Sequence, residues 1–268
     1  MVSRIAVLAL GTLIVAVAPA ARAQSASFSY ATGAHHYRVQ STTKVSQEVA
    51  GQSIEGELTA NHVLTLDISR KAKDTLAIGY TWDSATVSTT GGIPAPDLSK
   101  VGGTRASGLS AANGEMYSFD PGKPAVEGMP AMDEFETFLP IVAAANKKVG
   151  ESWVDTVKVT GNRGGLDVNT TIIVTSTYAG DTSYAGEKSW RIQRTLAYTI
   201  AGSGAPEGTP LVLEGTGTGQ RSDYVTSKGI YLGSEVTQTS KSTITLPANG
   251  MTIPMTTSVS SKVERKRS

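Results

Sequence analysis

Hydrophobic and polar residues alternate along most of the chain. In the first such segment Tyr37, Val39 and Val45 have one parity, whereas Arg38 and Lys44 have the other. Side chains of a β-strand point alternately to the two faces of a sheet, so this pattern predicts strands with one buried and one solvated face. We therefore expect a mainly β protein with an antiparallel sheet.

The predicted strands are unusually long. Tyr37–Val49 would span about 43 Å at roughly 3.3 Å per residue, where most strands have five or six residues. Such strands favour a strongly curved sheet, either a half-barrel or an open barrel. The Asn113-Gly114 pair predicts a tight hairpin. Further strands are expected at Leu64–Ile68, Leu76–Trp82, Thr104–Leu109, Glu115–Phe119, Trp153–Thr160, Leu166–Tyr178, Lys188–Ala201, Leu211–Tyr224, Ile230–Leu246 and Met251–Val263.

Residues 130–146 depart from the alternation. Apolar residues recur there at spacings of three and four, which predicts a short helical segment over Met132–Ala145. Pro140 would kink or split this helix because proline lacks a backbone N–H, so two short helices or turns are the alternative. The apolar positions are Met132, Phe135, Phe138, Leu139 and Val142.

The first 23 residues have the features of a signal peptide. Arg4 precedes an apolar stretch, Ile5–Ala18, and Ala21-Arg22-Ala23 is a small-x-small cleavage site. We expect export to the periplasm or secretion. Residues 24–268 would then form a single all-β domain in two halves, 24–129 and 147–268, linked by the helical segment 130–146.

Composition narrows the classes of partner. Without the two arginines of the signal peptide the chain has 22 basic and 23 acidic residues, which argues against nucleic-acid binding. No cysteine is present, so no disulfide can form.

No later apolar stretch approaches the roughly 20 residues of a membrane-spanning helix. Aromatic residues make up 6% of the chain and no aromatic girdle is visible, which disfavours an outer-membrane barrel. We expect a soluble protein that does not span a membrane.

Polar residues interrupt the inward-facing parity of two strands. Ser41 and Thr43 lie between Val39 and Val45, and three polar residues lie between Val236 and Ile244, namely Gln238, Ser240 and Ser242. A packed core seldom contains such a series. Either these strands extend past the core, or they line a concave and partly solvated cavity.

Arg194 has the parity of its apolar neighbours Ile192 and Leu196 and is therefore predicted to point inward. An unpaired charge there would be very costly. A β-bulge, a snorkelling side chain or a structural ion pair would explain it. As a functional alternative, Arg194 would anchor the acidic head group of a ligand in a cavity.

Signatures of catalysis and of metal binding are weak. The three histidines, His35, His36 and His62, are expected at the surface or at strand ends, with His36 and His62 about 13 Å apart, so we predict no metal site. The chain has no Gly-x-Ser-x-Gly elbow and no thiol. The alternating glycines of Gly215–Gly219 indicate a bend or a bulky neighbour. We predict no catalytic residues and no cofactor, and expect that the protein is not an enzyme.

Two short motifs carry a resemblance. Lys148–Trp153 includes a Gly-acid-Ser-Trp step, and Gly229–Leu232 is a glycine followed by apolar residues. Together with the signal peptide they resemble an uncharacterised family of exported bacterial all-β proteins. The layout is also similar to that of the periplasmic lipoprotein-carrier superfamily, whose unclosed β-barrels wrap a helix and can hold acyl chains. This resemblance favours binding over catalysis and transfers no functional residue.

Two functions follow as hypotheses. The first is a carrier or binding module for a lipid or another apolar or amphipathic ligand on the concave face of the sheet. The second is a structural or interaction protein of the cell envelope, with a filled core and an envelope protein as partner. The residues expected to touch a ligand are Arg194, Met132, Phe135, Phe138 and Leu139.

Overall fold

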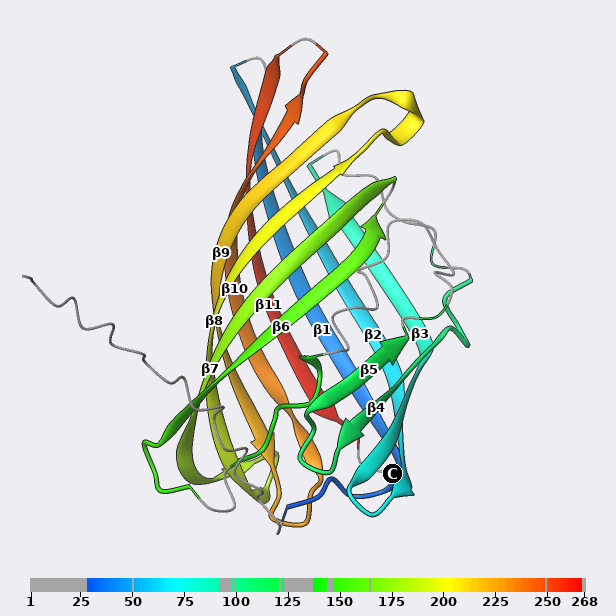
Figure 1. The fold of residues 1–268 in the computed structure, drawn as a ribbon, viewed down its shortest axis with the longest axis vertical. Coiled ribbons are helices and arrows are strands. Elements are labelled where there is room, and N and C mark those ends of the chain that lie inside the picture. Colours follow the sequence, from blue (N-terminus) through cyan, green and yellow to red (C-terminus); the bar gives the residue numbers. More distant parts are fainter. Residues whose placement is uncertain are drawn as a thin grey trace, which may run out of the picture.

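The computed structural model describes residues 28–49, 51–91, 98, 100–120, 122, 137–143, 147–163, 165–248 and 250–266. They form one antiparallel sheet of eleven strands, which confirms the predicted fold class (Figure 1). Within these ranges no helix has the length and hydropathy needed to cross a membrane. The elements are β1 Gly33–Val49, β2 Gln52–Ala72, β3 Thr75–Thr90, β4 Arg105–Ala111, β5 Met116–Asp120, β6 Ser152–Arg163, β7 Leu166–Tyr184, β8 Glu187–Gly204, a short 3-10 turn Pro206–Gly208, β9 Leu211–Val225, β10 Tyr231–Leu246 and β11 Met251–Arg265.

The strand order places the first and the last strand side by side. It runs β5-β4-β3-β2-β1-β11-β10-β9-β8-β7-β6, so β1 pairs with β11 in the middle of the sheet. This pairing joins the strands of the first half to those of the second. The edge strands are β5 and β6, and the sheet curls so that these edges approach each other (Figure 1).

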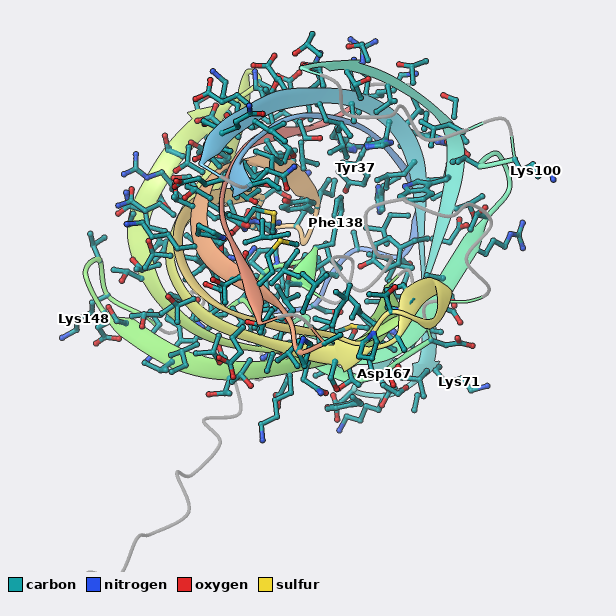
Figure 2. The ribbon with its side chains drawn as sticks, turned by 90° about the horizontal axis from the view of Figure 1, so that it is seen from above. Tyr37, Lys71, Lys100, Phe138, Lys148 and Asp167 are labelled. Carbon is teal, nitrogen blue, oxygen red and sulfur yellow. The ribbon has the colours of Figure 1, made fainter. Side chains whose placement is uncertain are left out.

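The curled sheet has an inner and an outer face. Seen from above, the strands form a ring with Phe138 inside it, whereas Lys71, Lys100 and Lys148 project outward (Figure 2). The two faces follow the predicted alternation, because Tyr37 is buried and its neighbour Arg38 is exposed. β1 has 17 residues and β2 has 21, so both are longer than the roughly 3–10 residues of most strands.

An aromatic core fills one end of the ring, near the turn between β2 and β3. Phe138 packs edge-on against Tyr37, Tyr80 and Tyr231, with ring centroids 5.4 to 5.6 Å apart. These contacts are the edge-to-face geometry that aromatic rings prefer. Around them lie the buried apolar residues Leu64, Leu66, Ile68, Leu76, Ile78, Val101, Val142, Ile192, Val225 and Val263.

The helix predicted over Met132–Ala145 is wrong for its described part, because residues 137–143 contain no α-helix. This segment enters the ring as an irregular chain. Backbone groups of this segment form hydrogen bonds with residues outside it. The Tyr30 hydroxyl donates to the Pro140 carbonyl at 2.6 Å, and the Val142 N–H donates to the Asn113 carbonyl at 2.8 Å. Pro140 lacks an N–H, so burial of Phe138 and these tertiary bonds determine the conformation.

Candidate functional site

A cavity of about 370 Å³ lies inside the ring, on the side of the aromatic core that faces the β1–β2 turn. Its wall is contributed by β1, β2, β3, β6, β7, β8, β9, β10 and β11, together with Thr137 and Phe138. The apolar lining residues are Val39, Leu64, Trp82, Val159, Ile172, Val174, Leu196, Ile200, Val236, Val259 and Val263.

Four of the five inward polar residues predicted on β1 and β10 line this cavity, whereas Ser242 is buried and is not part of the lining. Ser41 and Thr43 of β1 face it, as do Gln238 and Ser240 of β10. Of the two alternatives left open by the sequence, the lined cavity is therefore the one observed. Hydroxyl and amide groups can stay solvated there, whereas a dry core would require each to find a partner.

The alternating glycines of β9 shape the same wall. Gly217 pairs with Tyr198 on β8, and a Cβ placed on Gly217 would collide with the Tyr198 ring. The glycine therefore lets the ring lie flat over β9, as the bulky-neighbour interpretation predicted. The Tyr198 hydroxyl donates to the Thr239 carbonyl of β10 at 3.3 Å.

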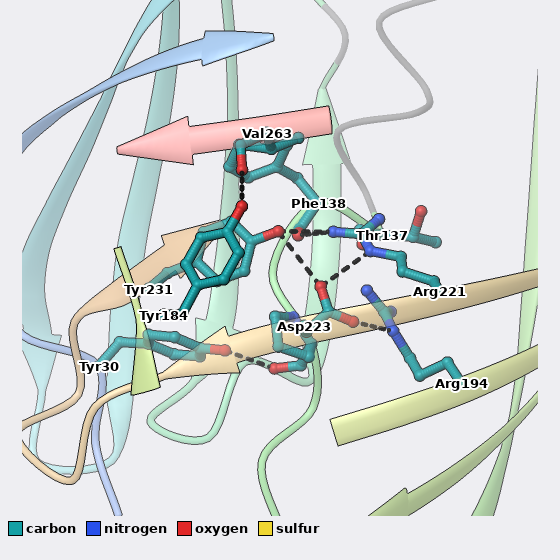
Figure 3. Close-up of polar contacts among 10 residues, drawn as sticks. Tyr30, Thr137, Phe138, Tyr184, Arg194, Arg221, Asp223, Tyr231 and Val263 are labelled. Carbon is teal, nitrogen blue, oxygen red and sulfur yellow. Dashed lines mark hydrogen bonds and ion pairs between the residues drawn. The ribbon is translucent and has the colours of Figure 1, made fainter. Parts of the chain in front are cut away.

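A buried polar network forms the floor of the cavity, at its boundary with the aromatic core (Figure 3). Arg194 Nε donates to Asp223 Oδ2 at 2.6 Å, and Arg221 Nε donates to Asp223 Oδ1 at 2.8 Å. The Tyr231 hydroxyl donates to the same Oδ1 at 3.2 Å. One carboxylate thus accepts from two guanidinium groups and a phenol.

The pairing of β8 with β9 creates this network. Arg194 lies directly opposite Arg221, a cross-strand placement that repels because both charges point to the same face. Asp223, two residues along β9, lies on that face and reaches both guanidinium groups. Of the explanations expected for an inward Arg194, the structural ion pair is the one observed, and the side chain also borders the cavity.

Burial affects the ionisation of these groups differently. It lowers the pKa of Arg194, which is 5% exposed, and the charge of Arg221 adds to this effect. Burial acts the same way on Arg221, but Asp223 and Tyr231 outweigh it and raise the pKa of Arg221. Burial also raises the pKa of Tyr231, to about 12. Guanidinium groups do not lose their proton in proteins, so both arginines stay charged.

A second, smaller cavity of about 210 Å³ lies where the sheet edges approach each other. Its lining includes Glu115 beside β5, Asp155 on β6, Leu139 and Arg194. Burial raises the pKa of Asp155, Glu115 raises it further, and Arg194 partly opposes the shift. Arg194 therefore borders both the internal cavity and the lateral one.

The prediction of surface or strand-end histidines is wrong for His62. This residue is 7% exposed, lines the internal cavity and stacks on Trp82 with ring centroids 5.6 Å apart. Burial lowers its pKa. His36 is exposed and bonds Thr65 Oγ1 through Nδ1 at 2.9 Å. Among the residues that the structure describes, no group of three or more histidine, aspartate or glutamate side chains could hold a metal ion.

The predicted ligand-contacting residues separate into three groups. Arg194 and Phe138 line the internal cavity, and Leu139 lines the lateral one. Met132 and Phe135 lie outside the described residues. Arg221 and Asp223 were not predicted, although both share the parity of Gly215, Gly217 and Gly219 on the same strand and therefore point inward.

No protein-family model matches the chain, and no curated protein matches it. Among solved structures, two crystal structures of Pseudomonas aeruginosa OccK2 (OpdF), one of them in complex with glucuronate, resemble it over 87% of this chain and 98% of theirs. Both have 9% sequence identity and a TM-score of 0.27. Similarity this low assigns the chain neither the fold nor the function of OccK2.

Proposed function

We propose that this protein is an exported, soluble binding or carrier module that holds an apolar or amphipathic ligand in its internal cavity. The observation that carries the proposal is the cavity itself. At about 370 Å³ it falls within the roughly 300–1,000 Å³ of small-molecule sites. The function is binding without chemical conversion.

The lining of the cavity suits an amphipathic ligand. Apolar residues such as Ile172, Leu196 and Val236 would contact a hydrocarbon chain, while Ser41 and Gln238 provide hydrogen-bonding groups. Such a mixture of apolar walls and a few polar groups is typical of ligand pockets. The alternative of a structural envelope protein with a filled core is less well supported, because the cavity leaves space between the described side chains inside the ring.

The outer face of β1 and β2 carries polar and charged pairs, as expected of a surface in contact with water. Lys44 of β1 and Glu57 of β2 form an exposed ion pair at 3.6 Å, and Gln40 and Asn61 share a hydrogen bond on the same two strands. The signal peptide at residues 1–23 would bring the protein to the periplasm or outside the cell.

Native mass spectrometry of the full-length gene product, purified from the periplasm without detergent, tests the proposal. We expect a co-purified small amphiphile, and we expect a fluorescent apolar dye to be displaced by a fatty acid. Absence of any bound molecule in repeated preparations, together with no dye binding, would overturn it.

A matched pair of variants locates the site. Ser240→Trp places an indole in the cavity, whereas Thr239→Trp places it on the outer face of the same strand. We expect the first to abolish dye binding and the second to leave it unchanged. Equal effects would show that the dye binds elsewhere.

A further inference from the structure

The floor network contains one more positive charge than negative. Arg194 and Arg221 share a single carboxylate, that of Asp223, which is completely buried. Buried charges are normally paired, because an isolated ion in a medium of low polarity is strongly unfavourable. The surplus cation is therefore an unusual feature that fold stability alone does not explain.

The two arginines differ in how far their donors are used. Arg221 donates through Nε to Asp223, through Nη1 to the Thr137 carbonyl, and through Nη2 to the Phe138 carbonyl and the Tyr231 hydroxyl. It ties the irregular segment 137–143 to β9. Arg194, by contrast, donates through Nε to Asp223, and its buried Nη2 has no partner.

Arg194, the arginine with an unused donor, is also the one that lies next to the apolar wall of the cavity on its own strand. Its side chain borders the internal cavity at its floor, with Leu196 and Tyr198 following on the same inward face of β8. A ligand whose polar end reached Arg194 would lay its chain along the apolar wall of that strand. A guanidinium group suits the planar oxygens of a carboxylate better than any other protein cation.

We propose that Arg194 binds the acid head group of a single-chain monocarboxylate whose hydrocarbon chain occupies the internal cavity. This inference rests on the proposed function and adds the chemical class of the ligand. The bound carboxylate neutralises the surplus charge and accepts a hydrogen bond from Nη2. Because Nη2 is covered in this structure, the head group reaches it after a local shift of the guanidinium group or of Thr137 and Phe138.

Two acidic groups, Asp155 and Glu115, weigh against this inference, because both line the lateral cavity with Arg194. Asp155 lies on the edge strand β6, and its charge is the one that Arg194 stabilises. Burial and the nearby Glu115 favour its neutral form by raising its pKa. We therefore expect Asp155→Asn to leave monocarboxylate binding intact or to strengthen it, since the variant removes a competing negative charge.

Three amphiphiles with the same chain and different head groups test the inference: decanoate, 1-decanol and decyltrimethylammonium. Each is titrated at neutral pH and fixed salt, below its micelle concentration, against the dye-loaded wild-type protein. We expect decanoate to bind about tenfold or more tighter than decanol, as a hydrogen bond to a charged group allows, and the cation to bind most weakly. Acetate, which has the head group without the chain, should not displace the dye.

Arg194→Met then removes the charge and keeps the volume. We expect it to bind decanoate and decanol equally, with the affinity for decanol retained. Arg38→Met is the matched control on the outer face, changes net charge equally, and should keep the preference for decanoate.

The outcomes separate the two proposals. Equal binding of decanoate and decanol by the wild type overturns the inference alone and leaves the proposed function standing. Displacement by acetate at a similar concentration also overturns it, because the site would then bind simple anions. If no amphiphile binds at all, the proposed function fails and the inference with it. The wild-type series needs no variant, so it is decisive even if Arg194→Met fails to fold.

Discussion

Removing the carboxylate of the floor network should destabilise the protein far more than removing one of its cations. In Asp223→Asn the guanidinium groups of Arg194 and Arg221 lose their shared counter-ion while remaining buried. Breaking a buried pair in this way costs about 3–5 kcal/mol, because the remaining charge is uncompensated. That is a large part of the roughly 5–15 kcal/mol by which most domains are stable.

Arg194→Met should behave in the opposite way. It removes the hydrogen bond to Asp223, which at a charged group contributes about 1.5–3 kcal/mol. It also removes the surplus buried cation, whose desolvation costs several kcal/mol even after relaxation. Asp223 keeps Arg221 and Tyr231 as donors. The two effects nearly cancel, so we expect a change within about 1 kcal/mol or a net stabilisation.

Urea unfolding at neutral pH, followed by circular dichroism, measures both variants. With an m-value of about 3 kcal/mol per M, a loss of about 4 kcal/mol lowers the midpoint by roughly 1.3 M for Asp223→Asn. The midpoint of Arg194→Met should equal or exceed that of the wild type. If Arg194→Met destabilised the protein as much as Asp223→Asn does, Arg194 would be a structural member of the network and the reasoning about surplus charge would be refuted.

Three further changes test separate parts of the structure. Gly217→Ala should lower the free energy of unfolding by about 1–3 kcal/mol and reduce dye binding, because the new methyl group pushes the Tyr198 ring into the cavity. Gly161→Ala, where a Cβ meets no atom within 4 Å, should have neither effect. Equal losses of stability in thermal unfolding would contradict this. Phe138→Ala should lower the unfolding free energy by about 3–5 kcal/mol, and a loss below 1 kcal/mol would show that the aromatic core does not depend on this ring. The wild type should lose stability as the pH falls below about 6.5, because burial lowers the pKa of His62 in the folded state and the unfolded state then binds more protons. His62→Phe should reduce this pH dependence of the unfolding free energy. An unchanged dependence would contradict the assignment to His62.

Local alternation allowed most of the sheet to be predicted from the sequence. The predicted strands Leu211–Tyr224, Ile230–Leu246 and Met251–Val263 differ from the observed bounds by two residues or fewer, because side chains alternate between the two faces of the sheet. The predicted strand Leu64–Ile68, by contrast, covers only part of β2. The pairing of β1 with β11 was not predicted, since it joins residues more than 200 positions apart and leaves no local signal.

The candidate site was predicted only in part, for a similar reason. Arg194 stood out because its parity conflicts with its charge, and the polar series on β1 and β10 indicated a cavity as one of two alternatives. Asp223 did not stand out, since its role depends on the register between β8 and β9. The helix prediction over Met132–Ala145 failed in its described part because the apolar spacing of Phe138, Leu139 and Val142 reflects burial inside the ring and not helical periodicity.

A crystal structure of the protein with bound decanoate tests the central claim most directly, that the ring holds an amphiphile by its acid head group. We predict density for the chain along Ile172, Leu196 and Val236, with a carboxylate oxygen within hydrogen-bond distance of a terminal nitrogen of Arg194. A cavity that contains only water at saturating decanoate, or a ligand whose carboxylate lies away from Arg194, would contradict the account.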